Sequence, residues 1–288
     1  MNKRKLCIIF NPAARGEKAN SLREELQNLA GDTPIFASTG AESVNELAVT
    51  AVNRGYDHIV AAGGDGTVNG VINGIGDADV LLSVLPIGTM NVFAYELGIR
   101  SSQLKKCWEI IQHGQPKTVD LALANQTYFV QLAGVGLDAL TVQATDLQMR
   151  KTIGPVSYLL AAAQVIGRPA PMLEVHFEDG AESTGCFILI GNGRFYGGPF
   201  SLFREARNDD GLLDVLIFKH QSYLDIFRYL QGVLIGNHTD LPDIEYRQTR
   251  SVRVSSDRPV PVELDGDVVG TTPVEFEIAR RKLQVVVG

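Results

Sequence analysis

The chain has 288 residues, of which 45% are hydrophobic and 20% are charged. This composition is sufficient for the core of one large domain or two smaller ones, and it excludes an intrinsically disordered chain. Lysine and arginine total 26 against 33 aspartates and glutamates, so the formal net charge is −7. Without a stripe of basic residues, a nucleic-acid partner is not expected.

The sequence also lacks the patterns of zinc sites, disulfide frameworks and membrane spans. Its cysteines, Cys7, Cys107 and Cys186, form no CxxC pair, so we expect reduced thiols in a cytoplasmic protein. The apolar run after the basic N-terminus is only about six residues long, which is too short for a signal peptide. No later run is long enough to cross a bilayer. We expect a soluble protein that meets a membrane only at its surface, and the sequence does not indicate its oligomeric state.

Strands and helices alternate through the first part of the chain. Apolar and amphipathic runs predict strands at 6–10, 34–37, 59–62 and 80–85, and helices at 21–30, 44–52, 68–75, 91–97 and 104–112. This alternation is typical of a parallel sheet with helices on both faces, which binds ligands at the carboxyl ends of its strands. Asn11, the segment 63–67 and the pair Gly88 and Thr89 all follow predicted strands.

After about residue 120 the pattern changes to many short strands. They are predicted at 119–123, 128–132, 173–177, 186–190, 213–218, 252–254, 260–264, 274–278 and 283–287, with helices at 156–166 and 223–235. Short strands separated by Gly and Asp turns favour a β-sandwich. We therefore predict an α/β domain over 1–122 and a β-sandwich domain over 123–288, with a cleft between them.

Two glycine-rich segments each follow a strand and open a helix. They read Gly63-Gly64-Asp65-Gly66-Thr67 and Pro86-Ile87-Gly88-Thr89-Met90-Asn91. Glycines let the backbone come close to a ligand, and a helix N-terminus turns N–H groups toward an anion, so the pattern predicts a phosphate site. Asp65 would repel bare phosphate and therefore favours a nearby divalent metal or hydroxyl. The alternative is a strand-to-helix turn in which the glycines only allow the backbone to turn tightly and bind no ligand.

The chain resembles the diacylglycerol/sphingosine lipid kinase family, in particular its bacterial members, from Asn11 to Asp267. The resemblance rests on Asn11-Pro12 with Gly16, on the segments 63–69 and 86–91, on Gly191-Asn192-Gly193 with Gly197-Gly198, on the segment 209–214 and on Leu264-Asp265-Gly266-Asp267. GGDGT alone also occurs in NAD kinases and phosphofructokinases. The two later acidic segments favour a lipid kinase, with the fold of the NAD kinase/diacylglycerol kinase-like enzymes.

This resemblance implies an ATP- and Mg²⁺-dependent enzyme that transfers the γ-phosphate of ATP to a lipid hydroxyl, in transient contact with a membrane surface. The implied ATP-binding residues are Asn11, Pro12, Ala13, Ala14, Arg15, Thr39, Gly63, Gly64, Asp65, Gly66, Thr67, Val68, Asn69, Gly88, Thr89 and Asn91. Among these, Asn11 and Pro12 also suit a plain strand terminator.

The resemblance further implies a metal site in the acidic segment that starts near residue 207. Its ligands would be the backbone carbonyls of Arg207 and Leu212 and the carboxylate of Asp210, with Asp209 in the water network. The alternative for this segment is a solvated turn. The aromatic residues between 195 and 203 are open to two interpretations, sandwich core or an apolar lip for an acyl chain.

The late Asp-Gly-Asp turn is implied to supply the base that deprotonates the lipid hydroxyl, with Asp65 acting through Mg²⁺ or a water. Asp265 and Asp267 are equal candidates, and Asp-Gly also favours a simple hairpin. The family commonly has Glu where this chain has Asp267 and an acidic residue where it has Val92. These departures leave open a non-catalytic nucleotide-binding regulatory protein, and the shared GGDGT segment leaves open an NAD kinase-like enzyme. The lipid itself is not identified.

Overall fold

The computed structural model describes residues 4–12, 19–39, 43–100, 103–144, 166 and 169–288. The chain divides into two compact units, unit 1 with residues 1–121 and 280–288, and unit 2 with residues 122–279. None of the helices formed by the described residues is long and apolar enough to cross a membrane.

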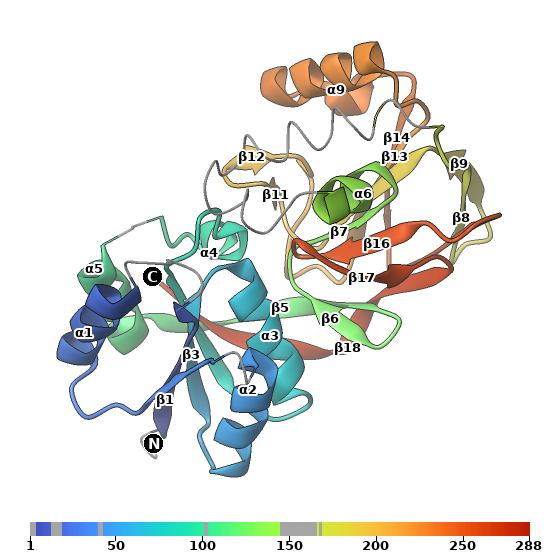
Figure 1. The fold of residues 1–288 in the computed structure, drawn as a ribbon. Coiled ribbons are helices and arrows are strands. Elements are labelled where there is room, and N and C mark those ends of the chain that lie inside the picture. The colour runs from blue at the N-terminus through green and yellow to red at the C-terminus, as the bar shows by residue number, and fades with distance from the viewer. Residues whose placement is uncertain (1–3, 13–18, 40–42, 101–102, 145–165, 167–168) are drawn as a thin grey trace. The chain divides into compact units, whose positions relative to one another are not determined.

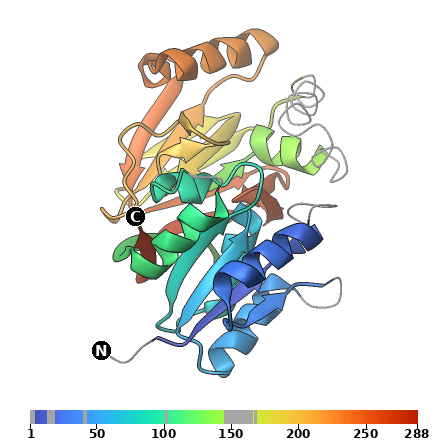
Figure 2. The same cartoon turned by 90° about the vertical axis from the view of Figure 1, so that its left-hand side faces the viewer.

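Unit 1 alternates strands and helices, as predicted. Its elements are β1 (Leu6–Phe10), α1 (Ala19–Ala30), β2 (Ile35–Ala37), α2 (Val44–Asn53), β3 (His58–Gly63), α3 (Asp65–Ile75), β4 (Leu81–Pro86), α4 (Val92–Glu96), α5 (Leu104–His113) and most of β5 (Gln115–Ala124). The strands pair in parallel in the order β2-β1-β3-β4. Figure 1 shows α1 and α5 on one face of this sheet and α2 and α3 on the other. Figure 2 looks onto the face that carries α1 and α5.

The central strands of unit 1 are buried on both faces. All six residues of β3 and all six of β4 are buried. Helices on both faces exclude water from the sheet, and this is why these strands read as continuous apolar runs rather than alternating ones. The carboxyl ends of β1, β3 and β4 therefore meet at one edge of the sheet, where the predicted phosphate segments begin.

The last strand of the chain departs from the predicted domain division. β18 (Val274–Val287) is one strand where the sequence predicted two, and Gln284 and Val285 pair in parallel with Leu81 and Leu82 of β4. Residues 280–288 accordingly belong to unit 1, whereas the sequence placed them in the second domain. A terminal strand carries no local pattern that says which sheet it joins.

Unit 2 is a two-sheet β structure. Its elements are β6 (Thr127–Phe129), β7 (Leu132–Val135), α6 (Leu137–Ala144), β8 (Leu173–Phe177), β9 (Glu182–Gly185), β10 (Phe187–Gly191), β11 (Phe195–Tyr196), β12 (Phe200–Ser201), β13 (Leu213–Phe218), α9 (Tyr223–Ile235), the 3₁₀ turn η3 (His238–Asp240), β14 (Ile244–Thr249), β15 (Ser251–Ser256), β16 (Pro261–Leu264) and β17 (Asp267–Thr271). One antiparallel sheet has the order β14-β13-β10-β7-β16-β17. In the other, β15 pairs with β18 and β8, and β8 pairs with β9.

Apolar side chains fill the space between the two sheets of unit 2. Ile188 and Val215 of the six-stranded sheet belong to the same buried cluster as Val175 and Val252 of the other. A second cluster lies on the outer face of the six-stranded sheet, where α6 and α9 cover it. The predicted β-sandwich is thus confirmed, with two helices added on one side.

Two predicted elements differ from the structure for local reasons. The strand predicted at 128–132 is interrupted between β6 and β7, because the backbone at Val130 and Gln131 donates to a side chain instead of a ladder. The helix predicted at 156–166 lies almost wholly outside the described residues. α6 was not predicted, and neither were the short strands β9, β11, β12, β14 and β17.

Candidate functional site

The first glycine segment forms the junction between β3 and α3. The helix begins at Asp65, three residues before its predicted start, so Asp65, Gly66 and Thr67 form its first turn. Gly64 is the N-cap residue with an extended backbone. The first turn of such a helix presents N–H groups that have no intrahelical acceptor, and these groups attract anions.

The two predicted glycine segments meet in unit 1. A Cβ built on Gly88 would lie 2.4 Å from the Cα of Gly64, so only glycine allows this approach of the two backbones. The N–H groups of Ile87 and Gly88 donate to the carbonyl of Gly63 at 3.1 and 3.3 Å. Packing between the loops therefore accounts for the glycines at these positions, and it also brings two helix N-termini to one edge of the sheet.

A short polar network joins the ends of β1, β2 and β3. Asn11 Nδ2 donates to Thr67 Oγ1 at 3.1 Å, and Ser38 Oγ donates to Asn11 Oδ1 at 3.4 Å. Ser38 was not predicted as a site residue, although it directly follows a predicted strand. Thr39 is exposed beside it, and Pro12 is half-buried. Ala13, Ala14, Arg15 and Gly16 lie outside the described residues.

The remaining predicted phosphate residues differ in how firmly they are held. Asn91 has a left-handed backbone with φ 50°, and its side chain bonds Gly88 twice, accepting from the N–H at 3.0 Å and donating to the carbonyl at 2.9 Å. Thr89 is exposed at the tip of this loop, and Val68 is a buried residue of α3. Asn69 Oδ1 accepts from Asn73 Nδ2 at 2.9 Å. Asn91 therefore shapes the loop.

Asp65 links the start of α3 to the start of α4. Its Oδ1 accepts the backbone N–H of Phe93 at 3.1 Å. Burial raises the pKa of Asp65, and hydrogen bonds from the backbone at Phe93, Val92 and Asn91 act against that rise. The carboxylate thus has a structural role, capping α4, beside the metal or water role that the sequence predicted.

We expect Asp65→Ala to lower the free energy of unfolding by about 1 kcal/mol, because α4 loses its cap. Asp65→Asn keeps an acceptor oxygen for the Phe93 N–H and should change it by only a few tenths, as Asn and Asp cap about equally well. Urea unfolding followed by circular dichroism measures both, with Asp32→Ala as the exposed control. Equal losses for the Ala and Asn variants would contradict the capping role.

In unit 2 the Asp-Gly-Asp turn joins β16 to β17. The carboxylate of Asp265 accepts three backbone N–H groups, from Val130 at 2.9 Å and from Gln131 and Leu132 at 3.0 Å each. Its own N–H donates to the carbonyl of Leu132 at 2.9 Å, and its φ is 48°. Asp267 is exposed at the first position of β17. The two carboxylates, equal candidates by sequence, thus occupy different environments.

A buried pair of carboxyl groups beside this turn was not predicted. Asp138 on α6 and Glu263 on β16 hydrogen-bond to each other, and Tyr196 Oη donates to Asp138 Oδ1 at 2.5 Å. The N–H of Gly266 donates to Glu263 Oε2 at 2.8 Å. A Cβ on Gly134 would lie 2.6 Å from Asp138 Oδ2, so a glycine makes room for the pair.

Burial favours a protonated carboxyl in the Asp138–Glu263 pair. Burial raises the pKa of both carboxyls, and the Asp138 carboxylate raises that of Glu263 further. Two adjacent carboxylates away from water cannot both stay charged, so Glu263 keeps its proton and donates it in a hydrogen bond to Asp138. The only signal in the sequence was an acidic residue inside a predicted buried strand.

We predict that the free energy of unfolding of Glu263→Gln increases relative to that of the wild type as the pH rises. Folded Glu263 keeps a proton that the unfolded chain releases above about pH 4.3, so its stabilising contribution is present below that pH and is lost as pH rises toward the folded pKa. A glutamine mimics the protonated form and does not titrate. Urea unfolding from pH 5 to 8 should show a relative gain of at least about 1 kcal/mol.

The matched control for this prediction is Glu277→Gln, an exposed glutamate on β18. Its difference from the wild type should be flat over the same pH range. A flat difference for Glu263→Gln as well would mean that the pair does not hold its proton in the folded state.

In the acidic segment that begins near residue 207, one contact favours a bound cation and another opposes it. Asp210 Oδ1 accepts the N–H of Leu212 at 3.0 Å, which brings this carboxylate beside the Leu212 backbone. The guanidinium of Arg207, however, pairs with Asp209 at 3.2 Å and offsets its charge. Within the described part of the chain there is no group of three or more His, Cys, Asp or Glu side chains suited to a metal ion. The metal site remains a prediction.

Asp214, at the end of the same acidic segment, belongs to the interior of unit 2. Tyr246 Oη and Gln248 Nε2 donate to its Oδ1, and the residue is fully buried on β13. Burial raises the pKa of Asp214 to about 6. Its carboxyl is therefore a core group, hydrogen-bonded through Oδ1, rather than part of a surface metal turn.

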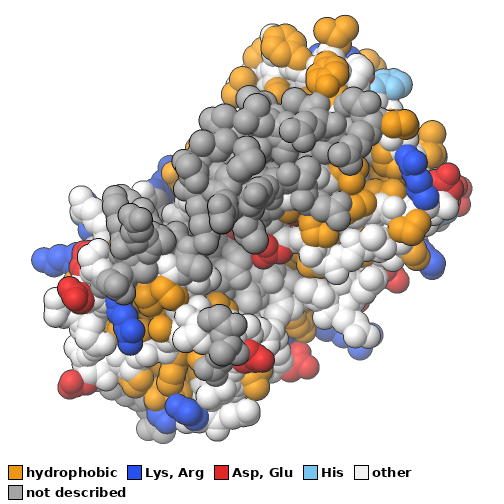
Figure 3. All heavy atoms as spheres, viewed as in Figure 1, with side chains coloured by type: hydrophobic (Ala, Val, Ile, Leu, Met, Phe, Trp, Pro, Cys, Tyr) orange, Lys and Arg blue, Asp and Glu red, His pale blue; other side chains and the backbone are white. Residues whose placement is uncertain are grey.

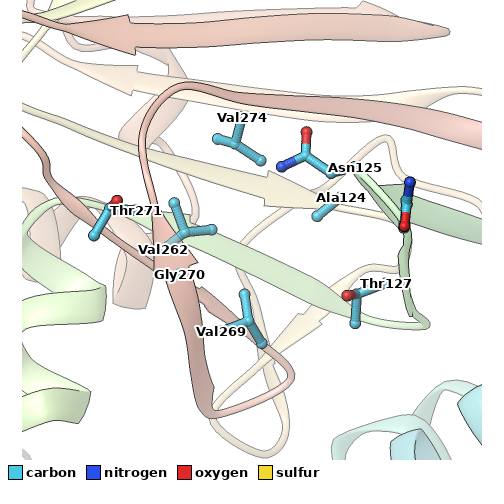
Figure 4. A pocket seen from close by; sticks show the side chains of 9 residues that line it. Ala124, Asn125, Thr127, Val262, Val269, Gly270, Thr271 and Val274 are labelled. Atoms are coloured by element: carbon cyan, nitrogen blue, oxygen red, sulfur yellow. The ribbon is translucent and has the colours of Figure 1, made fainter.

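A surface hollow of about 250 Å³ opens elsewhere in unit 2. Figure 4 shows the side chains around it, which come from the β5–β6 turn and from β16, β17 and β18. Its lining is Ala124, Asn125, Gln126, Thr127, Val262, Val269, Gly270, Thr271 and Val274. None of the predicted site residues lines this hollow, so it is separate from the sites described above.

Two protein families match the chain, one for each part. The diacylglycerol kinase catalytic domain family matches residues 5–124, and the YegS C-terminal NAD kinase beta sandwich-like domain family matches residues 131–287. The diacylglycerol kinase of Bacillus subtilis (strain 168) is 30% identical over 289 residues, covering 97% of this chain and 95% of the relative. The diacylglycerol kinase of Staphylococcus carnosus (strain TM300) is 26% identical, covering 96% and 93%.

A solved structure shares the same fold. The crystal structure of a diacylglycerol kinase from Bacillus anthracis strain Sterne matches with a TM-score of 0.80 at 22% sequence identity, covering 100% of this chain and 98% of the other. The predicted fold class, an α/β part followed by a β-sandwich, is confirmed by this likeness and by the two family matches.

Proposed function

Because this chain belongs to the diacylglycerol kinase catalytic-domain family, with a YegS-type C-terminal domain, we propose that it transfers the γ-phosphate of ATP to the hydroxyl of a diacylglycerol-like or sphingoid lipid. ATP use follows from membership of a kinase family. The observation that carries the proposal is the contact between Gly64 and Gly88, which sets two helix N-termini side by side.

The residues around the glycine loops fit the phosphates of ATP. Phosphoryl transfer depends on positioning and charge neutralisation more than on covalent chemistry by the protein. We assign the N–H groups at the start of α3 to phosphate binding, since glycine lets a ligand approach them closely. Thr67, held by Asn11, and the exposed Thr89 supply hydroxyls beside these groups. ATP, when bound, supplies the transferred phosphoryl group.

Asp65 is proposed to act on Mg²⁺ through water rather than by direct coordination. Its Oδ1 already accepts the Phe93 N–H, which limits the carboxylate's freedom. Burial alone raises the pKa of Asp65, and a nearby divalent cation would favour its charged form. The cation, when present, would offset the charge of the phosphates.

Asp267 is proposed as the general base for the lipid hydroxyl. A base must come within hydrogen-bond reach of the proton that it takes. Asp267 is exposed, whereas Asp265 is occupied by three backbone N–H groups. Asp265 is therefore assigned to positioning the turn, and the base role goes to Asp267.

The test is transfer of label from ATP to a total lipid extract, and then to purified diacylglycerol and sphingosine. Asp267→Asn should lose at least about 100-fold in turnover while unfolding like the wild type, because it is exposed and general-base catalysis contributes at least that factor. Asp257→Asn, an exposed aspartate in the turn after β15, is the matched control. Full activity of Asp267→Asn would remove Asp267 from the base role.

Asp65→Asn separates structure from chemistry at the phosphate loops. It keeps the cap on α4, so loss of label transfer in a variant of wild-type stability would support the proposed charge role. Labelled NADP formed from NAD would instead favour the NAD kinase-like alternative. Tight ATP binding with no product on any lipid would favour the non-catalytic alternative, which the residues Val92 and Asp267 leave open.

A further inference from the structure

The outer face of α9 is apolar and exposed. Its side chains are Tyr223, Leu224, Phe227, Leu230, Leu234 and Ile235, and they are between 50% and 81% exposed. At 3.6 residues per turn they cover an arc of about 140° along the whole helix. Figure 3 shows hydrophobic side chains gathered over α9 at the top of the view. We call these six residues the α9 face.

The inner side of α9 fixes the helix on unit 2. Tyr229 packs against Phe187 and Phe218 with ring centroids 6.4 and 5.1 Å away. Ile226 and Val233 join the same cluster, which lies on the six-stranded sheet. The helix therefore has its own buried side, and the α9 face is a second apolar surface that this packing does not use.

The polar groups of α9 are satisfied away from that face. Arg228 pairs with Asp225 at 3.2 Å and also with Asp243, and the most exposed residues of the helix are all uncharged, including Gln231, the one polar side chain within the arc of the α9 face. Ser222 and Asp225 form a capping box at the N-terminus. A capped helix whose charged side chains lie outside its apolar face can bring that face to an apolar medium without burying a charge.

We propose that the α9 face docks on the surface of a lipid bilayer, and that this contact brings the enzyme to its substrate. The inference rests on the proposed function, since the hydroxyl to be phosphorylated belongs to a lipid. Large uncharged side chains on one side of a surface helix are typical of helices that lie in a membrane interface. Isolated exposed apolar residues are normal in proteins, whereas a continuous face marks an interaction site.

The lack of charge on the α9 face and the lipid nature of the proposed substrate favour a bilayer over a second copy of the chain. The chain carries a net charge of −7, so contact must come from apolar insertion rather than attraction to anionic lipid. Phe200, itself exposed, lies on β12, a strand that contacts α9. Homodimer interfaces are also apolar at their core, so a second copy of the chain is the competing occupant, and the test below distinguishes it.

The test is flotation of the full-length protein with phosphatidylcholine vesicles, and with vesicles in which anionic phosphatidylglycerol replaces part of the phosphatidylcholine. The variant is Leu224→Gln/Leu234→Gln, which keeps helix propensity on two exposed positions. Its matched control is Val49→Gln/Met172→Gln, which changes two apolar residues, 42% and 59% exposed, outside α9. Circular dichroism of all three proteins checks that they are folded alike.

The wild type and the control should bind neutral vesicles at least as well as anionic ones, and added salt should not release them. The α9 variant should lose roughly tenfold or more in partition coefficient, because two apolar side chains leave the interface. Binding confined to anionic vesicles, or equal binding by the variant, would overturn the proposal. So would a wild-type dimer that the variant dissociates without any change in vesicle binding.

A short-chain diacylglycerol that is dispersed as monomers keeps this inference separate from the proposed function. With that substrate the α9 variant should phosphorylate at the wild-type rate, while on vesicle-borne diacylglycerol it should be slower. If no protein phosphorylates either substrate, the proposed function fails and flotation alone decides the membrane contact. If the α9 variant is as fast as the wild type on both substrates, the docking role of α9 fails and the kinase activity stands.

Discussion

The approach of Gly64 to Gly88 is the constraint on which the candidate phosphate site depends. β3 and β4 pair in parallel up to Gly63 and Pro86, so their loops leave the sheet side by side. Because there is no room for a Cβ between them, the loops pack backbone to backbone. Asp65 then ties the first residue of α3 to the first turn of α4. Two helix N-termini are thereby fixed at one edge by main-chain contacts rather than by flexible side chains.

Unit 2 uses an aspartate for a similar purpose. The three N–H groups on Asp265 hold the turn after β16 against the segment before β7, and the same turn carries the N–H that bonds Glu263. A carboxylate held in this way positions backbone and has few lone pairs left for a substrate proton. The arrangement separates two neighbouring aspartates into a support and an exposed group, Asp267.

The sequence predicted what local pattern determines and missed what distant pairing determines. The strand at 6–10 and the helix at 223–235 have the predicted bounds, because apolar periodicity marks them. The predicted start of α3 is three residues late, because glycines have a low helix propensity and gave no helical signal in the first turn. Asp138 and Glu263 meet only because β7 and β16 pair with Glu263 opposite Gly134. The spacing of residues along the chain does not predict this strand register. It does not predict the three hydrogen bonds to Asp265 either.

Helix α9 shows why a correct prediction of an element can leave its role open. A helix that is apolar on most sides reads from sequence as a buried helix. In the structure Tyr229 and Gly232 take the buried side, and a full face of larger side chains remains exposed. Packing the buried side of α9 against the sheet does not require leucine at positions 224 and 234. Leu224 and Leu234 face water in this chain of net negative charge, and their exposure is unfavourable unless another apolar phase receives the two side chains. A lipid kinase meets an apolar phase wherever its substrate resides.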